Sequence, residues 1–268
     1  MIITSPSNPK IKAIRKLRDK KYRKETNSFF VEGIRIVSEA IESDWEIEQI
    51  VVCPELLSGS SGYELISEKL DHRVDVLRVD QSLFHSLSTK DGPKGLAAVI
   101  KQKHFQLDVI KKFPGCWVAL DRVADPGNLG TIMRTCDAVG AKGVILVGNC
   151  TDPYDPSSIR GSMGAVFSLF LVQCEQKEFV EFKNNHSIHL VGTSDHGTEN
   201  YQSPTYPDEM ILIMGSEREG LHENLWQVCD RLVQIPMQGK SDSLNLSVAC
   251  GVCLYEIYNQ HRVKSEVL

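Results

Sequence analysis

The sequence lacks any apolar run near the roughly 18 residues needed to cross a bilayer, and its basic N-terminus has no apolar stretch behind it. We therefore expect neither export nor membrane insertion, and a cytoplasmic location. The second half also lacks the His, Cys and carboxylate spacing of a metal site, so we expect no metal. No G-x-G-x-x-G follows a strand-like segment, and Gly127-Asn128-Leu129-Gly130 is a poor substitute, which counts against a nicotinamide-dependent Rossmann enzyme.

An overall excess of positive charge is missing as well. The net charge of −5 counts against a uniformly basic nucleic-acid-binding protein. The charge is uneven, however, because residues 1–24 contain nine Lys and Arg residues and one acidic residue. Such a run is either a solvated face or a set of phosphate contacts.

The eight cysteines show no framework of paired spacings and lie mostly within apolar runs. This favours reduced thiols that pack as small hydrophobic side chains. Cys250 and Cys253 form a C-x-x-C in an apolar, helix-like run without a second pair, so we expect packing rather than redox chemistry or zinc binding.

A chain of 268 residues can form one large domain or two small ones. Its first part alternates short strands and helices, which predicts an α/β layer. The expected strands there are 29–31, 47–53, 74–79 and 95–100, and the expected helices are 35–41, 63–70 and 81–87. Before them, Asn8 and Pro9 predict a helix start, with Ile11, Ile14 and Leu17 as a thin apolar stripe.

Residues 101–115 are charged and irregular, which is typical of a linker. After them, near-continuous apolar strands flanked by helices predict a parallel sheet buried on both faces. The expected strands are 117–121, 143–147, 168–173, 188–192, 210–214 and 232–235, and the expected helices are 128–139, 158–165, 176–184, 222–229 and 244–262.

Three of these strands end in polar turns. In 232–249, LVQIPMQGKSDSLNLSVA, the strand ends at Pro236, one of Ser241 to Ser243 caps a helix near Leu244, and Asn245 lies in its first turn. We expect this helix to bury an apolar stripe, made of Leu244, Val248 and Val252.

The second turn, in MILIMGSEREGL at 210–221, places Gly215 directly after a buried strand, where a glycine allows the backbone to approach a ligand or to turn tightly. The third, in ALDRVADPGNLGTIMRT at 119–135, allows Asn128 to cap a helix. Arg134 lies about 200° from Ile132 on that helix and should point away from the core.

In this order, the three segments resemble the motifs of the SpoU (TrmH) family of RNA ribose 2′-O-methyltransferases in the SPOUT superfamily. The N-terminal part, with Phe29-Phe30-Val31-Glu32-Gly33, is similar to the RNA-binding domain of the thiostrepton-resistance-like subgroup. The resemblance implies an α/β fold with a small ribosomal-protein-like RNA-binding domain at 1–100, a linker at 101–115 and a SPOUT domain at 116–268 that contains a deep trefoil knot near 210–250.

The resemblance also implies S-adenosylmethionine-dependent methylation of a ribose 2′-hydroxyl in structured RNA, with ribosomal RNA favoured over transfer RNA, by a homodimer paired through the C-terminal domain. The implied catalytic residues are Arg134, Asn128, Glu217, Ser243 and Asn245. The implied cofactor-binding residues are Thr193, Gly215, Ile235, Met237, Ser243 and Leu244. The expected RNA contacts are Lys10, Lys12, Arg15, Arg18, Lys21, Arg23 and Arg35.

The role of Arg134 and the choice of substrate stay open. Arg134 could help to deprotonate the 2′-hydroxyl or could anchor a phosphate, which is the physically easier role because a guanidinium normally stays charged. The function could also be that of a transfer-RNA ribose methyltransferase, or of an inactive RNA-binding protein of the same fold. An inactive protein would have no need of Asn128, Arg134, Glu217 and Asn245, and all four are present.

Overall fold

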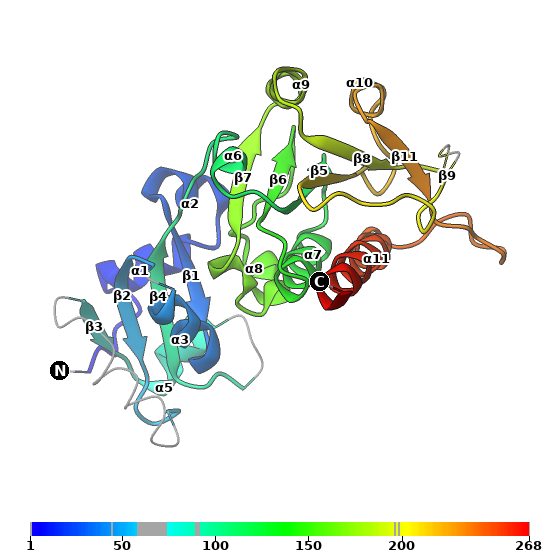
Figure 1. Ribbon diagram of the computed structural model, residues 1–268. Coiled ribbons are helices and arrows are strands. Elements are labelled where there is room, and N and C mark those ends of the chain that lie inside the picture. Colours follow the sequence, from blue (N-terminus) through cyan, green and yellow to red (C-terminus); the bar gives the residue numbers. More distant parts are fainter. Residues whose placement is uncertain are drawn as a thin grey trace. The chain divides into compact units, whose positions relative to one another are not determined.

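The structure is a computed structural model that describes residues 2–43, 45–57, 74–88, 92–195, 197 and 199–267. Its contacts divide the chain into two compact units (Figure 1). The first consists of Met1–Lys103 with Tyr154–Phe167, and the second of His104–Pro153 with Ser168–Leu268. The helix expected at 63–70 lies outside the described residues.

The first unit contains a four-stranded sheet with the order β1-β4-β2-β3. Its strands are β1 (Ser28–Glu32), β2 (Ile47–Val52), β3 (Asp75–Arg78) and β4 (Leu96–Lys101). β4 pairs antiparallel with β1 and β2, and β2 pairs parallel with β3. The helices are α1 (Pro9–Lys16), α2 (Lys20–Thr26), α3 (Ile34–Glu42), α5 (Gln81–Leu87), α8 (Pro156–Ser162) and the short 3-10 helix η1 (Ala165–Phe167).

The predicted start of the first helix is confirmed, because the Asn8 side chain accepts a hydrogen bond from the backbone N–H of Lys10 and Pro9 is the first helical residue. The basic stretch nevertheless forms two helices. α1 ends before Leu17, and the Asp19 side chain caps α2. Three apolar residues of the stretch, Ile11, Ile14 and Leu17, are buried against β2, β3, β4 and α5, so this segment is part of the core of its unit.

The segment 154–167 packs within the first unit, although its neighbours in sequence belong to the second. The ring of Phe29 lies 4.6 Å from that of Tyr154, and Trp45 Nε1 donates to the carbonyl of Phe167 at 3.1 Å. The helix expected at 158–165, as part of the C-terminal domain, forms instead as α8 and packs within the first unit. α8 ends at Met163, whose left-handed φ of 53° stops the helix.

The second unit contains a seven-stranded sheet with the order β7-β6-β5-β10-β8-β11-β9, and all its paired strands run parallel, as predicted. The strands are β5 (Cys116–Asp121), β6 (Gly143–Val147), β7 (Phe170–Cys174), β8 (His189–Thr193), β9 (Glu199–Asn200), β10 (Met210–Met214) and β11 (Arg231–Gln234). The helices are α6 (Val109–Lys112), α7 (Pro126–Ala138), α9 (Gln176–Asn185), α10 (Glu223–Trp226) and α11 (Leu246–Val267).

Helices cover both faces of this sheet (Figure 1). Trp117 and Ala119 of β5 pack with α6, α9 and α10 on one face. Their neighbours Val118 and Leu120 are also fully buried, and strand alternation turns them to the opposite face, where α7 and α11 lie side by side. The sheet is therefore buried on both faces, as its unbroken apolar strands predict.

The predicted burial of the last helix is wrong. Leu244 precedes α11 and is 38% exposed, and Val248 is 52% exposed. The buried face of the helix is instead made of Leu246, Cys250, Cys253, Leu254 and Ile257. Because apolar residues occur on two faces of α11, helical spacing alone could not select the buried one.

Residues 104–115 are part of the second unit rather than a separate linker. Phe105 forms a bridge to Val172 of β7, and Val109 and Ile110 of α6 are buried in the core. These apolar residues alternate with charged ones, so the segment looks polar in sequence. The two-residue strand β9 was not predicted because it is too short to form a pattern.

Candidate active site

Four neighbouring strands bring the three motif loops together. Thr193 ends β8, Gly215 follows β10, Ile235 follows β11, and the loop to Asp125 follows β5. The carboxyl ends of parallel strands share one edge of the sheet, so these residues lie along the same edge. β10 lies between β5 and β8, although it follows both in sequence. Open α/β sheets bind ligands where the strand order changes in this way.

Asp125 and Pro126 begin α7. The Asp125 side chain accepts from the backbone N–H of Asn128 at 2.7 Å, and Pro126 occupies the first turn. Asp125 therefore caps this helix, and Asn128, which could have capped it, lies in the first turn with its side-chain amide available for other contacts.

That amide joins two further motif residues in a chain of hydrogen bonds. Asn128 Nδ2 donates to Glu217 Oε1 at 3.2 Å, and Asn245 Nδ2 donates to Asn128 Oδ1 at 3.0 Å. Because a carboxylate only accepts hydrogen bonds, Glu217 fixes which way the Asn128 amide faces. Residues from all three motifs are thus held together at the carboxyl edge of the sheet.

Glu217 is held by the backbone as well. Its two carboxylate oxygens accept from the N–H groups of Ala124 and Asp125, each at 3.3 Å. Partial burial alone would raise the pKa of Glu217, but hydrogen bonds from its own backbone N–H, from Asn128 and from these two N–H groups outweigh it and hold the pKa below its ordinary value. Glu217 is therefore a carboxylate near neutral pH.

Asn245 also begins α11. Its Oδ1 accepts from the backbone N–H of Ser247 at 3.0 Å and from the Ser247 hydroxyl at 2.7 Å. The cap expected between Ser241 and Ser243 is therefore wrong by at least two residues. Ser243 is exposed, and its hydroxyl donates to Asp242 Oδ1 at 3.4 Å. Among the described residues its side chain makes no other hydrogen bond, so it does not join the hydrogen-bonded chain.

Arg134 lies on the exposed face of α7, as predicted. Its neighbours Ile132, Met133 and Cys136 are fully buried, and within the described ranges the Arg134 guanidinium makes no hydrogen bond or ion pair. The guanidinium is therefore free to bind a ligand.

The residues expected to bind the cofactor line the same edge. Thr193 Oγ1 contacts Met214 Sδ at 3.3 Å, and Met237 and Leu244 are exposed apolar side chains. A Cβ on Gly215 would lie 2.1 Å from the backbone of Gly220, so the turn itself requires this glycine. Whether the Gly215 backbone also contacts a ligand stays a prediction.

The expected RNA contacts belong to the first unit. The prediction that Arg23 is one of them is wrong. Its side chain is 1% exposed, and Nη1 donates to the carbonyls of Leu17 and Arg18 at 2.9 and 2.8 Å. Nη2 reaches Asp155 at 3.4 Å. A buried guanidinium satisfied in this way cannot bind phosphate, and the pattern of neighbouring residues did not indicate its burial.

Other basic residues have partners at the surface. Arg18 Nη2 donates to three consecutive carbonyls at the end of α5, at 3.0 to 3.1 Å, and Arg15 donates to Ser86 Oγ at 2.6 Å. Lys10 pairs with Asp75. These contacts fasten α1 to its unit and leave part of each cation exposed.

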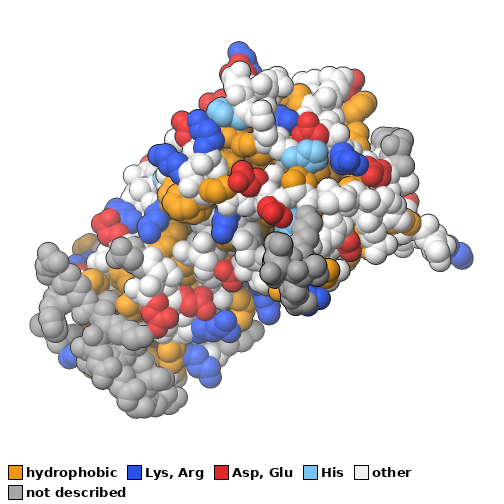
Figure 2. Space-filling view, viewed as in Figure 1, with side chains coloured by type: hydrophobic (Ala, Val, Ile, Leu, Met, Phe, Trp, Pro, Cys, Tyr) orange, Lys and Arg blue, Asp and Glu red, His pale blue; other side chains and the backbone are white. Residues whose placement is uncertain are grey.

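Three of the expected RNA contacts are freer. Lys21 lies 4.0 Å from Glu25 and Arg35 3.1 Å from Glu39, both pairs at the surface. Among the described residues, Lys12 has no such partner. Positive and negative side chains are interspersed on the face of the molecule that Figure 2 shows.

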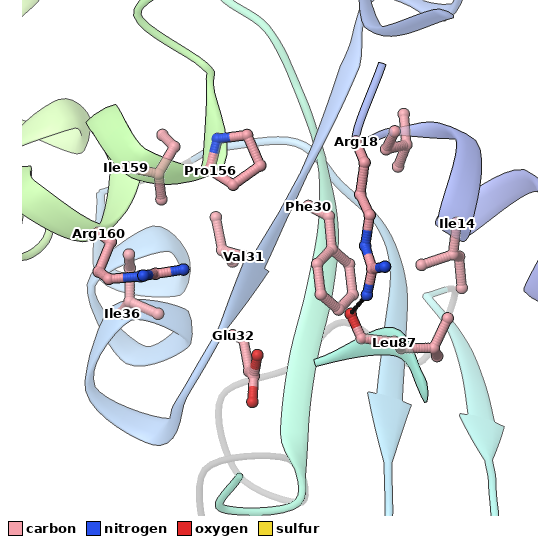
Figure 3. Close-up of a pocket in the computed structure, with 11 residues that line it drawn as sticks. Ile14, Arg18, Phe30, Val31, Glu32, Ile36, Leu87, Pro156, Ile159 and Arg160 are labelled. Atoms are coloured by element: carbon pink, nitrogen blue, oxygen red, sulfur yellow. Dashed lines mark hydrogen bonds between the residues drawn. The ribbon is translucent and has the colours of Figure 1, made fainter. Parts of the chain in front are cut away.

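The hollow in Figure 3 is not a ligand site. It lies in the first unit between α1, β1, α5 and α8 and is lined by apolar side chains with Arg18, Glu32 and Arg160. Its volume of about 30 Å³ has room for only a water or two.

Sequence reasoning missed three charged residues beside the candidate site. Arg122 Nε and Nη2 donate to the two carboxylate oxygens of Asp121 at 3.0 and 3.1 Å, and Nη1 donates to Glu219. Asp121 is 1% exposed, and its hydrogen bonds raise the pKa of Arg122. The sequence did contain one signal of this group: Asp121 ends a buried strand, and a buried carboxylate needs a partner.

Membrane-spanning helices and metal centres are both absent from the described part of the chain. No helix there is long and apolar enough to cross a membrane. Among the same residues, no group of three or more His, Cys, Asp or Glu side chains could hold a metal ion.

Comparison with known proteins identifies the family. A model of the SpoU rRNA Methylase family matches residues 115–255, and a model of the MRM3-like substrate binding domain matches residues 8–98. A 23S rRNA (uridine(2479)-2'-O)-methyltransferase of Streptomyces viridochromogenes is 33% identical over 255 residues, which cover 91% of this chain and 87% of that protein. The 23S rRNA (guanosine(2553)-2'-O)-methyltransferase RlmP of Bacillus subtilis (strain 168) is 28% identical, covering 95% and 98%.

A solved structure agrees in fold along nearly the whole chain. The AdoMet-bound rRNA methyltransferase from Sinorhizobium meliloti matches with a TM-score of 0.86 and 33% identity, covering 97% of this chain and 98% of that one. The family model spans more than half of the 268 residues, over the part that carries all three motifs. This chain therefore belongs to the SpoU rRNA methylase family, within the SPOUT superfamily.

Proposed function

We propose that this protein transfers a methyl group from S-adenosylmethionine to a ribose 2′-hydroxyl of ribosomal RNA. The observation that carries the proposal is the hydrogen-bonded chain Glu217–Asn128–Asn245, which joins the three family motifs at the carboxyl edge of the sheet. The names of the relatives, which are 23S rRNA 2′-O-methyltransferases, favour ribosomal over transfer RNA. This substrate would place the protein with the ribosomes in the cytoplasm.

The cofactor fits the loops around that chain. Within the described ranges, the backbone of 235–244 makes no backbone–backbone hydrogen bond, so its N–H and C=O groups are available to a ligand. Exposed Met237 and Leu244 lie among them, and this combination suits an adenine, which is flat and apolar on its faces and polar at its edge. We propose that Thr193, Gly215, Ile235, Met237, Ser243 and Leu244 hold the cofactor, which supplies an electrophilic methyl group.

The two asparagines each keep one N–H donor for a ligand. A side-chain amide has two such donors, and each of these amides uses one within the chain. Both Asn245 Oδ1 contacts go to Ser247, so the amide cannot turn without losing them. Asn128 and Asn245 would thus present fixed donors to an oxygen of the ribose or of the cofactor carboxylate.

Arg134 would act on the RNA. Its free, exposed guanidinium suits bidentate contact with a phosphate of the target nucleotide. A cation beside the ribose would also favour the deprotonated 2′-hydroxyl that attacks the methyl group. Ser243 makes no hydrogen bond to the other four residues of the proposed catalytic set.

The test is cofactor binding together with methyl transfer by the full chain. Calorimetry should detect S-adenosylmethionine binding that survives a chelator, and labelled methyl should pass from the cofactor to ribosomal RNA. Binding that needs a metal would remove the metal-free account, and binding without transfer to any RNA would favour an inactive RNA-binding protein.

For the substrate domain we propose contact between RNA phosphates and the exposed cations of α1, α2 and α3, with Lys12, Lys21 and Arg35 as the main contacts and Lys10, Arg15 and Arg18 assisting. A groove of about 510 Å³ beside α1 and α2 supports this placement. It contains half-buried Tyr22 and an ion pair of Lys101 with Glu48 at 2.8 Å, so it offers a ring face and polar groups to a nucleotide.

We also propose a homodimer paired through α11. Val248 and Tyr255 lie seven residues apart, so they project from the same side of the helix, and they are 52% and 53% exposed. Tyr258 beside them is 40% exposed and borders a hollow of about 400 Å³. Sedimentation should give a dimer that Val248→Glu with Tyr255→Glu dissociates. A wild-type monomer at micromolar concentration would contradict the proposal.

The fold-level proposal is a trefoil knot within 210–250. Its support is family membership together with the position of β10 between β5 and β8. A knotted chain pulled from its two ends should stop short of its full contour length. Complete extension would contradict the knot.

A further inference from the structure

The backbone of Arg122 has an unusual conformation directly beside the candidate active site. Its φ is 51°, in the left-handed region that residues other than Gly, Asn and Asp rarely adopt. The residue immediately follows β5, and its N–H still donates to the carbonyl of Val147 at 3.0 Å. Strain of this kind persists only where the surroundings hold the residue in place.

The surroundings of Arg122 consist of two carboxylates and a glycine. Asp121 takes two parallel hydrogen bonds from the guanidinium, and Glu219 takes a third. The Arg122 stem passes Gly148, where a Cβ would lie 3.4 Å from its Cγ. The side chain is therefore fixed along its length.

These contacts join two loops that are far apart in sequence. Asp121 Oδ2 also accepts from the backbone N–H of His222 at 3.0 Å. Asp121 and Arg122 therefore bind the loop 216–222 at two residues, His222 and Glu219. Glu217 lies within that loop, next to the gripped residues. Its own hydrogen bonds run to Ala124 and Asp125, a few residues beyond Arg122.

We infer that Asp121 and Arg122 are positioning residues that hold the loop 216–222 against the start of α7, and so fix Glu217 in reach of Asn128. This inference rests on the proposed function, because it gives the pair a purpose in methyl transfer. Arg122 itself directs Nε, Nη1 and Nη2 to carboxylates, so it acts through Glu217 rather than on the substrate.

Substitution of Arg122 by glycine tests this role. A glycine adopts a φ of 51° without strain, so Arg122→Gly removes the contacts to Asp121 and Glu219 while relaxing the backbone. The buried Asp121 carboxylate loses its charged partner, so we expect the melting temperature to fall despite the relaxed backbone. At a temperature where the variant is fully folded, kcat for methyl transfer should fall at least tenfold and KM for the cofactor should change less than threefold.

A second readout does not depend on activity. The backbone N–H groups of Ala124 and Asp125 donate to Glu217, so their hydrogen exchange reports whether the loop is held. We expect exchange at both to rise at least tenfold in Arg122→Gly, while the N–H of Leu129 within α7 is unaffected. Asp121→Asn, which keeps the shape of the side chain, should give the same pattern if the glycine variant does not fold.

A matched control is Arg231→Ala. Arg231 Nη1 contacts both carboxylate oxygens of Glu199 at 3.0 and 3.1 Å, at a strand with ordinary backbone and outside the candidate site. We expect wild-type kcat and exchange in this control. Normal kcat in Arg122→Gly, unchanged exchange at Ala124 and Asp125, or a loss of protection as large at Leu129 as at these two residues would overturn the inference. If exchange changes as expected but the wild-type protein methylates no RNA, the proposed function is contradicted and the positioning role of Asp121 and Arg122 is not.

Discussion

The side-chain amide of Asn128 donates to Glu217 at 3.2 Å across 89 residues of sequence. Asn245 extends the chain by donating to the same amide from a third loop. The first bond ties the start of α7 to the loop after β10, and each member fixes the orientation of the next. Donors and acceptors from three distant segments are thereby held ready for a ligand.

Asn128→Ala should lower the single-turnover rate of methylation about 100-fold, because it removes a fixed donor and frees Glu217 and Asn245 from each other. The residue is only partly buried, so the free energy of unfolding should change by no more than about 1 kcal/mol. Asn149→Ala, at an exposed loop residue, is the matched control. Full activity in the Asn128 variant would remove this residue from the site.

Arg134→Ala should reduce methylation on the order of 100-fold or more and leave cofactor binding nearly intact, because the guanidinium faces away from the helix core. Arg134→Lys separates the two roles, since a lysine can anchor phosphate as a point charge but cannot reproduce the planar fork. Recovery with lysine would indicate an anchor. Near wild-type turnover in the alanine variant would contradict both roles.

Glu217 should make stability depend on pH. Its pKa in the folded protein lies below the ordinary value of 4.5, so the carboxylate stabilises the fold above that value, and the contribution is lost as pH falls through the folded pKa. Unfolding measured from about pH 6 to about pH 3 should show the wild type losing more stability than Glu217→Gln. Parallel curves for the two proteins would indicate that the hydrogen bonds to Glu217 do not form in solution.

The exposed lysines of the first unit should contribute to RNA affinity through phosphate contacts. Replacing Lys12 and Lys21 together by methionine should reduce the slope of log affinity against log salt by about 0.7–0.9 for each lysine that binds a phosphate. Lys177→Met, an exposed lysine of α9 in the second unit, is the control. An unchanged slope in the double variant would make α1 and α2 a solvated surface. Deleting residues 1–24 is not a clean test, because Ile11, Ile14 and Leu17 are core residues.

Arg23→Ala should act on stability rather than on RNA. It would leave the carbonyls of Leu17 and Arg18 and the carboxylate of Asp155 without their shared donor, and removing one partner of a buried ion pair costs about 3–5 kcal/mol. Chemical denaturation measures the loss. A change below about 1 kcal/mol, with weaker RNA binding, would return Arg23 to the RNA contacts.

Short sequence patterns predicted the features of this fold that depend on neighbouring residues, namely helix starts and buried strands. Asn8 and Pro9 marked a helix start, and unbroken apolar strands marked a parallel sheet, because capping and burial leave direct traces in sequence. The contacts of 154–167 with Phe29 and Trp45 have no such trace, since each depends on residues more than a hundred positions away.

The sequence predicted which residues belong to the candidate site, but not which hydrogen bonds they make with one another. The motif resemblance selected Asn128, Glu217 and Asn245, and helical spacing turned Arg134 outward. Spacing could not reveal that Asp125 rather than Asn128 caps α7, or that Asn245 begins α11, because several adjacent residues of each turn have suitable side chains. Nor could it reveal the left-handed Arg122, whose conformation depends on contacts made across the sheet edge.

The most direct test of the proposed activity is the chemical position of the methyl group on the RNA. Ribosomal RNA incubated with S-adenosylmethionine and the wild-type protein should acquire one alkali-resistant linkage, because a 2′-O-methyl group blocks attack of the ribose oxygen on the adjacent phosphate. The Arg134→Ala protein should form this linkage at least about 100-fold more slowly. Methyl found on a base, or alkali-labile RNA throughout despite bound cofactor, would contradict the assignment of this chain as a ribose 2′-O-methyltransferase.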